Sequence, residues 1–180
     1  DFCTGGNLAV PNGEDIIPTI NALRECFDTV VQTQDWHPKK HQSFASTHGA
    51  EPFSTKELAY GEQVLWTDHC VQGTKGAEFR DDLIVKGSDI ILRKGTNPAV
   101  DSYSAFAEND GKTIPRFANG NSFSEEMKIR NISNLVFVGL AREICVAWNA
   151  EDAKKAGFGS TLVSDGAAAL DPHADKQKMA

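Results

Sequence analysis

The clearest pattern of apolar and polar residues lies in the last third of the chain, where it predicts a strand, a helix and a second strand. Residues 135–139 form a nearly continuous apolar run, which is typical of a strand that is buried on both faces. A helical stretch is expected over residues 144–156, and residues 161–164 favour another strand. A strand, a helix and a strand at this spacing make a βαβ unit, so we expect an α/β fold with a parallel sheet covered on both faces.

Other segments extend this pattern towards the N-terminus. Within residues 15–27, apolar side chains recur at i, i+4, i+7 and i+11, which predicts one face of a helix with Asp15 as its N-cap. Residues 35–79 lack any period and are rich in His, Trp, Gly and Asp, so we expect long ordered loops there, of the kind that carry function. The remaining expected elements are strands over residues 29–33 and 89–94 and a helix over residues 122–130.

Composition narrows the class of protein. The 180 residues are 40% hydrophobic and 24% charged, which argues against disorder and favours one domain. A net charge of −7 without a basic cluster argues against a nucleic-acid partner, and no apolar run approaches the ~18 residues of a membrane-spanning helix. Four widely spaced cysteines, with no secretory leader, predict free thiols and a cytoplasmic location. The chain opens on Asp1 and ends in a polar stretch, so we expect it to be cropped at both ends.

One carboxylate and three imidazoles gather in the segment that is poorest in regular structure. Asp35 and His37 are two residues apart, His41 follows, and His69 lies further along the same segment. Two imidazoles and a carboxylate are a common ligand set for a catalytic divalent metal with open coordination positions. Each His taken alone is better explained as a surface or hydrogen-bonding residue, but the cluster favours a metal site.

Cys145 is the candidate nucleophile. It follows the strand predicted over residues 135–139 and opens a helix, where unpaired backbone N–H groups and the helix dipole favour a thiolate. We therefore expect its pKa to fall below the ordinary value of about 8.5. The same N–H groups would stabilise an oxyanion formed when the thiolate attacks a carbonyl. The alternative is that Cys145 is a small buried apolar residue, as most single cysteines are.

Lys94 is a candidate cationic partner for this thiol. It ends a predicted strand and precedes Gly95, which would bring its amine to the carboxyl edge of the sheet, where α/β folds place their sites. A cation at this edge would lower the pKa of a neighbouring Cys. A lysine at the end of a strand is more often a solvated charge, so this signal is weak when taken alone.

Several segments, taken in order, carry a specific family pattern. Together they resemble nicotinamidases, also called pyrazinamidases, which are isochorismatase-like cysteine hydrolases, and the resemblance runs from residue 1 to about Leu170. The segments are DFCTGGNLAV at residues 1–10, QDWHP at 34–38, HQSF at 41–44, LWTDHCVQGT at 65–74, GAEF at 76–79, KG at 94–95, DSYSAF at 101–106, VGLA at 138–141, CV at 145–146 and EDA at 151–153.

The resemblance implies a three-layer α/β/α fold with a mostly parallel central sheet, formed as a single domain over residues 1–180. It implies hydrolysis of nicotinamide, and of pyrazinamide, to the acid and ammonia through a Cys thioester, in NAD salvage. The enzyme would need one divalent ion, zinc before iron or manganese, and a homo-oligomer is compatible with the family. The implied residues are Cys145 as nucleophile and Lys94 as its partner; Asp35, His37 and His69 as metal ligands, with His41 as an extra ligand or a support for one; Phe2, Trp66 and Tyr103 around the substrate ring; and the N–H groups of Ala141, after a cis peptide, and Cys145 as oxyanion donors.

The sequence departs from the family pattern at two points. The third catalytic residue of the family, an Asp, would fall four positions upstream of Asp1, and Asp1 cannot replace it, because four residues of strand span roughly 13 Å. Arg142, Glu143 and Ile144 precede Cys145 where the family usually has Thr, Asp and an aromatic residue or His. Two alternatives therefore stay open, namely a metal-independent cysteine amidase acting on another carbamoyl compound and a non-catalytic metal-binding pseudoenzyme.

Overall fold

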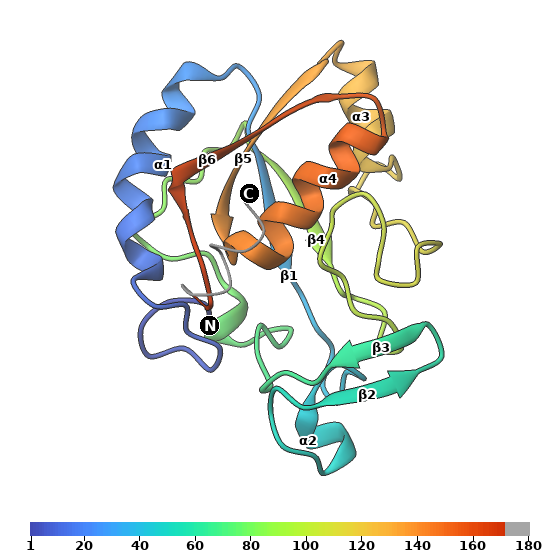
Figure 1. Ribbon diagram of the computed structural model, residues 1–180. Helices are drawn as coiled ribbons and strands as arrows, with labels where there is room; N and C mark the ends of the chain where they lie inside the picture. The colour runs from blue at the N-terminus through green and yellow to red at the C-terminus, as the bar shows by residue number, and fades with distance from the viewer. Residues whose placement is uncertain (172–180) are drawn as a thin grey trace.

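The computed structural model describes residues 1–171 and has the alternating helices and strands of an α/β fold (Figure 1). The strands are β1 (Val31–Asp35), β2 (Thr55–Leu58), β3 (Gly61–Val64), β4 (Ile90–Lys94), β5 (Asn134–Leu140) and β6 (Gly159–Ala168). The α-helices are α1 (Ile17–Leu23), α2 (Ala45–His48), α3 (Phe123–Ile129) and α4 (Ala147–Lys155). Short 3-10 helices are η1 (Gly13–Ile16), η2 (Arg24–Cys26) and η3 (Lys75–Ala77), and η4 (Arg142–Val146) is a π-helical turn.

Two pairs of parallel strands form the framework of the site. β5 and β6 pair from Asn134 opposite Gly159 to Leu140 opposite Ala168, with α4 between them in the chain, so the predicted βαβ unit is confirmed. β1 and β4 are also parallel, and their register ends with Asp35 opposite Lys94. The carboxyl ends of β1 and β4 therefore bring two candidate site residues side by side, although they are 59 positions apart in the sequence.

Helices cover both faces of these strands. α1 lies on one side, while α3 and α4 lie on the other (Figure 1). The buried core is made by apolar side chains from α3, α4, β4, β5 and the loops between them. Its members are Leu92, Ala105, Phe117, Phe123, Met127, Leu135, Ala153 and Phe158.

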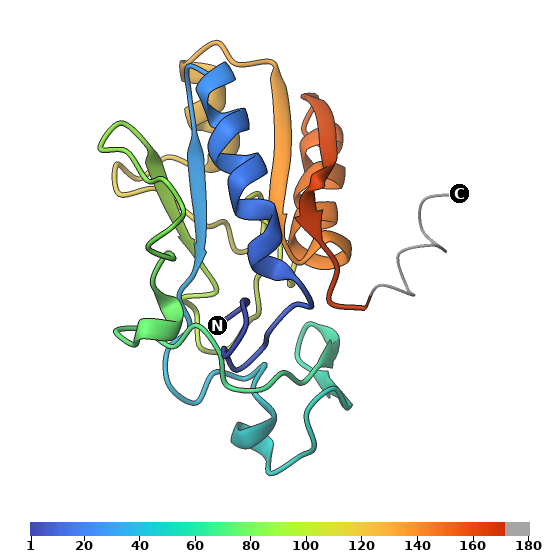
Figure 2. The same ribbon diagram turned by 90° about the vertical axis from the view of Figure 1, so that its left-hand side faces the viewer.

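The two parallel pairs are separated by a cavity. Within residues 1–171, β1 pairs only with β4, and β5 pairs only with β6. A cavity of about 550 Å³ lies between β1 and β5, where Figure 2 shows the two strands standing apart. Ile16 of η1 and Ile17, Ile20 and Leu23 of α1 contribute to its lining. The structure thus has the expected α/β layers, but its described strands form separate two-stranded sheets rather than one central sheet.

Sequence periodicity located the larger elements and missed the smaller ones. The helix expected over residues 122–130 forms as α3, and Ser122 caps it with Glu125 in a capping box. The helix expected over residues 15–27 forms as the consecutive η1, α1 and η2. The strand expected over residues 29–33 begins two residues later, at Val31. Residues 35–79 contain α2 and the β2–β3 hairpin, which sequence periodicity did not reveal because β2 is short and almost entirely exposed.

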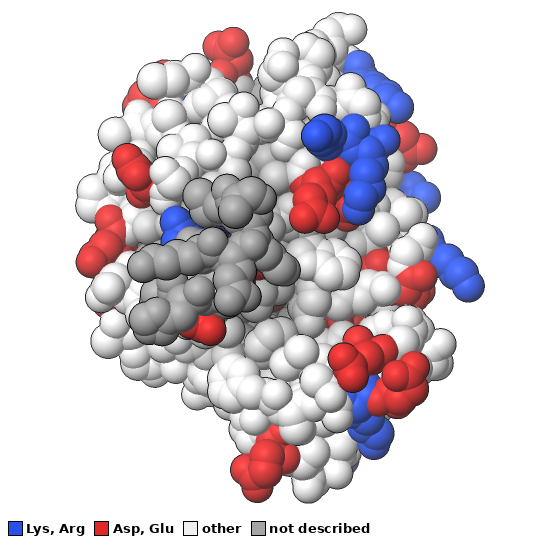
Figure 3. Space-filling model, in the orientation of Figure 1, with Lys and Arg blue, Asp and Glu red and all other residues white. Residues whose placement is uncertain are grey.

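None of the helices within residues 1–171 is long and apolar enough to cross a membrane. On the face drawn in Figure 3, most basic side chains lie on the right-hand side with acidic ones among them, and the left-hand side carries mainly acidic side chains.

Candidate active site

Lys94 and Asp35 form a buried ion pair at the carboxyl ends of β4 and β1. Lys94 Nζ lies 2.5 Å from Asp35 Oδ1 and donates to the Ser102 carbonyl at 2.6 Å, and the residue is 1% exposed. Burial alone would raise the pKa of Asp35, but the Lys94 ammonium holds it well below its usual range. Burial would likewise lower the pKa of Lys94, and the Asp35 carboxylate keeps it above its usual range. Lys94 is therefore a buried charge within the site and not a solvated charge at a strand end.

Cys145 lies in η4, directly after β5, with its Sγ 3.5 Å from Lys94 Nζ. The predicted pairing of the thiol with this lysine is thus present in the geometry. The expected fall in the pKa of the thiol is wrong, because burial raises it to about 11 and the nearby Lys94 charge only partly opposes that rise. The positive charge of Lys94 is already shared with Asp35, so less of it acts at the sulfur.

Asp35, His37 and His69 converge as a candidate metal centre. One ligand atom from each lies within 4.8 Å of the others. His37 Nε2 is 3.6 Å and His69 Nε2 is 4.0 Å from Asp35 Oδ2, which is too long for hydrogen bonds and leaves room for an ion between the atoms.

The proton positions also fit a cation. Nδ1 of His37 lies 3.0 Å from the Gly95 carbonyl, and Nδ1 of His69 lies 2.8 Å from the Thr67 carbonyl. Because a carbonyl oxygen can only accept a hydrogen bond, each Nδ1 carries the proton and each Nε2 has a free lone pair. His37 Nε2 is buried without a hydrogen-bond partner. Burial and the neighbouring His37 lower the pKa of His69 to about 4, which keeps this imidazole in the neutral form that ligates metals. The three residues therefore fit a divalent ion.

Gly95 supports this centre through its backbone. Its carbonyl holds the His37 ring, and its φ of +64° lies in the left-handed region that favours glycine. A Cβ on Gly95 would lie 2.4 Å from Cε1 of His37. The ring can occupy its position only because residue 95 has no side chain.

His41 is next to the candidate metal centre without contributing a free nitrogen to it. Its ring centroid is 4.6 Å from that of His37. Nε2 of His41 donates to the Asn97 carbonyl at 2.8 Å, and Nδ1 lies 2.7 Å from Ser43 Oγ. Both nitrogens are engaged with protein atoms, which favours a supporting role, while His37, His41 and Asp101 also bring ligand atoms within 4.8 Å of one another.

The predicted substrate-facing residues surround one small cavity. Its lining includes aromatic side chains predicted to hold the substrate ring, the nucleophile, an oxyanion donor, Asp35 and His69. Its volume is about 30 Å³, which is enough for a water molecule. Leu140–Ala141 is a cis peptide, as expected. The predicted residues that line the cavity are Phe2, Asp35, Trp66, His69, Tyr103, Ala141 and Cys145. Phe2, Asp35 and Cys145 also reach the larger cavity beside β1, whereas Trp66 and Tyr103 line only the small one.

Sequence reasoning missed several residues of this site. Asp101 is 2% exposed and accepts hydrogen bonds from Gln63 at 3.0 Å and from Trp66 Nε1 at 3.3 Å, so it orients an aromatic wall. Ile144 and Leu170 also line the cavity. The signal for Asp101 was its place in the DSYSAF segment, whereas Leu170 gave no signal because it reaches the site only through the path of the chain after β6.

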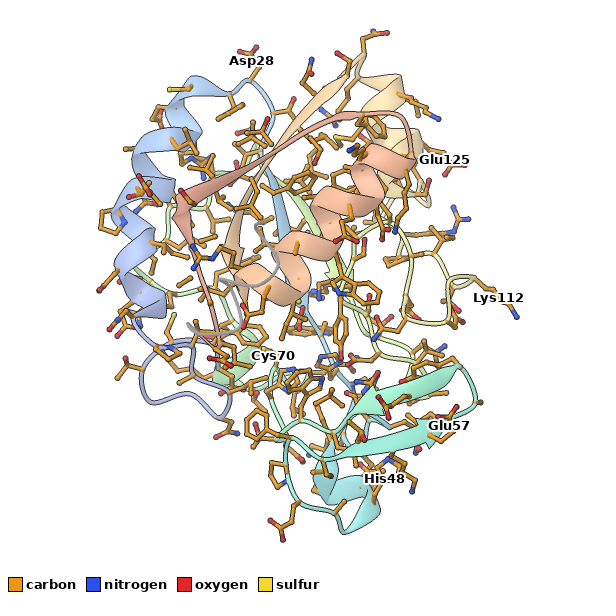
Figure 4. All side chains as sticks on the ribbon, viewed as in Figure 1. Asp28, His48, Glu57, Cys70, Lys112 and Glu125 are labelled. Atoms are coloured by element: carbon orange, nitrogen blue, oxygen red, sulfur yellow. The ribbon has the colours of Figure 1, made fainter. Side chains whose placement is uncertain are left out.

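The site lies between the strand ends and the β2–β3 hairpin. Figure 4 labels Cys70, which follows His69, in this position, whereas the labelled His48 lies on α2 at the far side of the hairpin. Cys70 donates its backbone N–H to the Asp1 carboxylate at 2.8 Å. This bond fixes the first residues of the chain against the loop that carries His69.

Comparisons with known proteins agree on one family. The model of the isochorismatase domain matches residues 1–180. A nicotinamidase of Acinetobacter baylyi is 48% identical over 177 residues, which are 98% of this chain and 80% of that protein. A nicotinamidase pyrazinamidase structure from Acinetobacter baumanii has a TM-score of 0.91 and 46% identity, covering 98% of this chain and 83% of that one. A pyrazinamidase of Pyrococcus horikoshii in complex with zinc has a TM-score of 0.78 and 30% identity, covering 99% and 86%.

Proposed function

The chain belongs to the isochorismatase domain family, and from that premise we propose that it is a nicotinamidase, an amidohydrolase that converts nicotinamide and water to nicotinate and ammonia. The observation that carries the proposal is the 3.5 Å approach of Cys145 Sγ to the buried Lys94 ammonium, beside a cavity lined by aromatic rings. We propose pyrazinamide as a second substrate, because the pyrazinamidases among the similar proteins act, by their names, on that amide.

Cys145 carries the covalent steps. Its sulfur attacks the carbonyl carbon of the amide, a C–S bond forms, and the carbonyl oxygen becomes an oxyanion. We assign stabilisation of that oxyanion to the backbone N–H groups of Ala141 and Cys145, which belong to the same turn. The C–N bond then breaks, and ammonia leaves with the proton of the thiol. Water hydrolyses the thioester, releasing nicotinate and restoring the thiol.

Lys94 and the aromatic residues prepare this attack. The ammonium at 3.5 Å stabilises the thiolate and so partly opposes the rise in the Cys145 pKa that burial causes, and its bond to the Ser102 carbonyl fixes it in place. We propose that Phe2, Trp66 and Tyr103 hold the heteroaromatic ring, since aromatic faces and edges are the surfaces on which such rings pack.

Asp35, His37 and His69 would hold the divalent ion. When bound, the ion would act as a Lewis acid that helps to orient a substrate in the site. We propose zinc, supported by the mixed imidazole and carboxylate donors and by the zinc complex of the similar Pyrococcus horikoshii protein.

The proposed activity serves NAD salvage, because it converts one pyridine compound of that route into another. We place it in the cytoplasm, and the free state of all four cysteines supports a reducing compartment.

The test is release of ammonia from nicotinamide by the full-length protein and by Cys145→Ala. Ammonia release should fall to the uncatalysed rate in Cys145→Ala, because Cys145 is the one thiol among the described residues that line the small cavity. Cys26→Ala is the matched control, since Cys26 is exposed and lies in η2, outside the site lining. Turnover by the unaltered protein no faster than by Cys145→Ala would overturn the proposal.

A further inference from the structure

The buried amide of Asn149 connects two parts of the site. Asn149 lies on α4, one helical turn after Cys145, and is 6% exposed. Its Oδ1 accepts from the Ala105 N–H at 2.9 Å, and its Nδ2 donates to the Tyr103 carbonyl at 3.2 Å and to the Cys145 carbonyl at 2.7 Å. An amide group has two N–H donors and one oxygen acceptor, and each of these functions is used on a backbone group here.

These three bonds join the nucleophile to the segment that carries a wall of the cavity. We call residues 102–105 the ring-wall segment, because Tyr103 lines the substrate cavity and the Ser102 carbonyl accepts from Lys94. Two of the Asn149 bonds go to this segment, and the third goes to the residue that bears the thiol. A single buried side chain thus bridges the ring-wall segment and the Cys145 turn.

The ring of Tyr103 has its own supports, which are independent of Asn149. Its hydroxyl oxygen accepts from Gln63 Nε2 at 2.9 Å and from Trp66 Nε1 at 3.2 Å. Trp148 packs edge-on against the same ring, with centroids 5.3 Å apart. Loss of the Asn149 amide would therefore leave the ring in place while it frees the Cys145 turn to shift relative to the ring.

We propose that Asn149 is a positioning residue, which fixes the distance and angle between the Cys145 sulfur and the carbonyl carbon of a ring-bound substrate. The inference rests on the proposed function, because the substrate is taken to be a heteroaromatic amide held by the aromatic wall. Asn149 makes no contact with the reacting atoms and acts only through the backbone of Cys145 and of the ring-wall segment.

The variants are Asn149→Ala and Asn149→Asp. Asn149→Asp has nearly the same size and keeps the acceptor for Ala105, but it loses both donors, so it tests the bridge even where Asn149→Ala folds poorly. The control is Asn121→Ala, which also removes a side-chain amide bond, from Asn121 Nδ2 to Glu126 at 2.8 Å, but just before α3 and outside the cavity lining.

Three readouts separate positioning from a general loss of structure. For nicotinamide, kcat of Asn149→Asp should fall about 10- to 100-fold with KM changed by less than about threefold, because misalignment of about 1 Å affects the attack more than ring binding. Binding of pyridine-3-carboxaldehyde, whose carbonyl adds reversibly to the thiol when the ring is held, should weaken by a similar factor. Alkylation of Cys145 by iodoacetamide, which needs no ring site, should stay within about threefold of the unaltered protein.

The outcomes are distinct for the inference and for the proposed function. An unaltered kcat and aldehyde affinity in Asn149→Asp, or an equal loss in iodoacetamide alkylation, would overturn the positioning role. Failure of the aldehyde to bind the unaltered protein would overturn it as well, because no ring would be aligned with the thiol. If the unaltered protein binds the aldehyde but releases no ammonia from nicotinamide, the proposed function fails, and the aldehyde and iodoacetamide measurements alone decide the role of Asn149.

Discussion

Replacing Lys94 tests how the thiol of Cys145 becomes reactive. Lys94→Met removes the positive charge that lies 3.5 Å from the sulfur and 2.5 Å from Asp35 and keeps much of the aliphatic side chain. The pKa of Cys145 is already raised to about 11 by burial, and Lys94 is the group that opposes this rise. The substitution should raise the pKa further and reduce the thiolate population at neutral pH.

The distance gives the size of the effect. Two unit charges 3.5 Å apart interact by ~5 kcal/mol at an effective dielectric constant of 20, and 1.36 kcal/mol corresponds to one pKa unit. The thiolate population would therefore fall by up to about three thousandfold, and we expect alkylation to slow at least tenfold. The Asp35 carboxylate would also lose its buried partner, which destabilises the fold by roughly 3–5 kcal/mol.

The assay is iodoacetamide alkylation of Cys145 near neutral pH, followed by mass spectrometry of the peptide that contains it, together with ammonia release. Lys94→Gln is a second variant, because it retains a donor for the Ser102 carbonyl while it removes the charge. Thermal unfolding of both variants shows whether they are folded. Lys86→Met is the control, since the Lys86 ion pair with Glu25 is exposed. Alkylation at the unaltered rate in a folded Lys94 variant would refute the reasoning and leave Lys94 as a partner of Asp35 alone.

His37→Ala should lose most of the bound metal, as measured by elemental analysis after dialysis, while His48→Ala on α2 keeps it; full occupancy with an unchanged KM would remove His37 from the ligand set. Asp89→Asn should lower the free energy of unfolding in urea by roughly 3–5 kcal/mol, because its pair with Arg24 at 2.7 Å is buried, whereas Asp82→Asn in an exposed pair should lower it much less. The Arg24 guanidinium lowers the pKa of Asp89, so this stability is present above the unfolded carboxyl pKa of about 3.9 and is lost as the pH falls through the lower folded value; equal acid sensitivity of Asp89→Asn and the unaltered protein would contradict this.

Hydrophobic periodicity predicted the helices and strands that bury one face or both faces. The strand at residues 135–139 and the strand at 89–94 were located because their apolar runs face a core, and both became the parallel strands that end at the site. The pairing of β1 with β4 could not be predicted, because the sequence of a strand does not show which other strand it pairs with. The hairpin of β2 and β3 was missed for a different reason, namely that its exposed side chains carry no hydrophobic period.

The sequence predicted only those residues of the candidate site whose side-chain chemistry is unusual enough to suggest a role. Asp35, His37 and His69 stand out because carboxylates and imidazoles ligate metals, and the structure brings all three together. Asn149 does not stand out, because a single Asn on a helix gives no sign that its amide will be buried against three backbone groups. The raised pKa of Cys145 was also out of reach, since it depends on burial in three dimensions.

Gly95 has a consequence for how sequence variants of this protein are interpreted. A methyl group at this position would overlap the His37 ring, and the same residue supplies the carbonyl that holds the proton on His37 Nδ1. A Gly95→Ala variant would therefore lose the ion while every ligand side chain stays intact. A survey that inspects only Asp35, His37 and His69 would score such a variant as competent, although a residue with no side chain decides whether the ion is held.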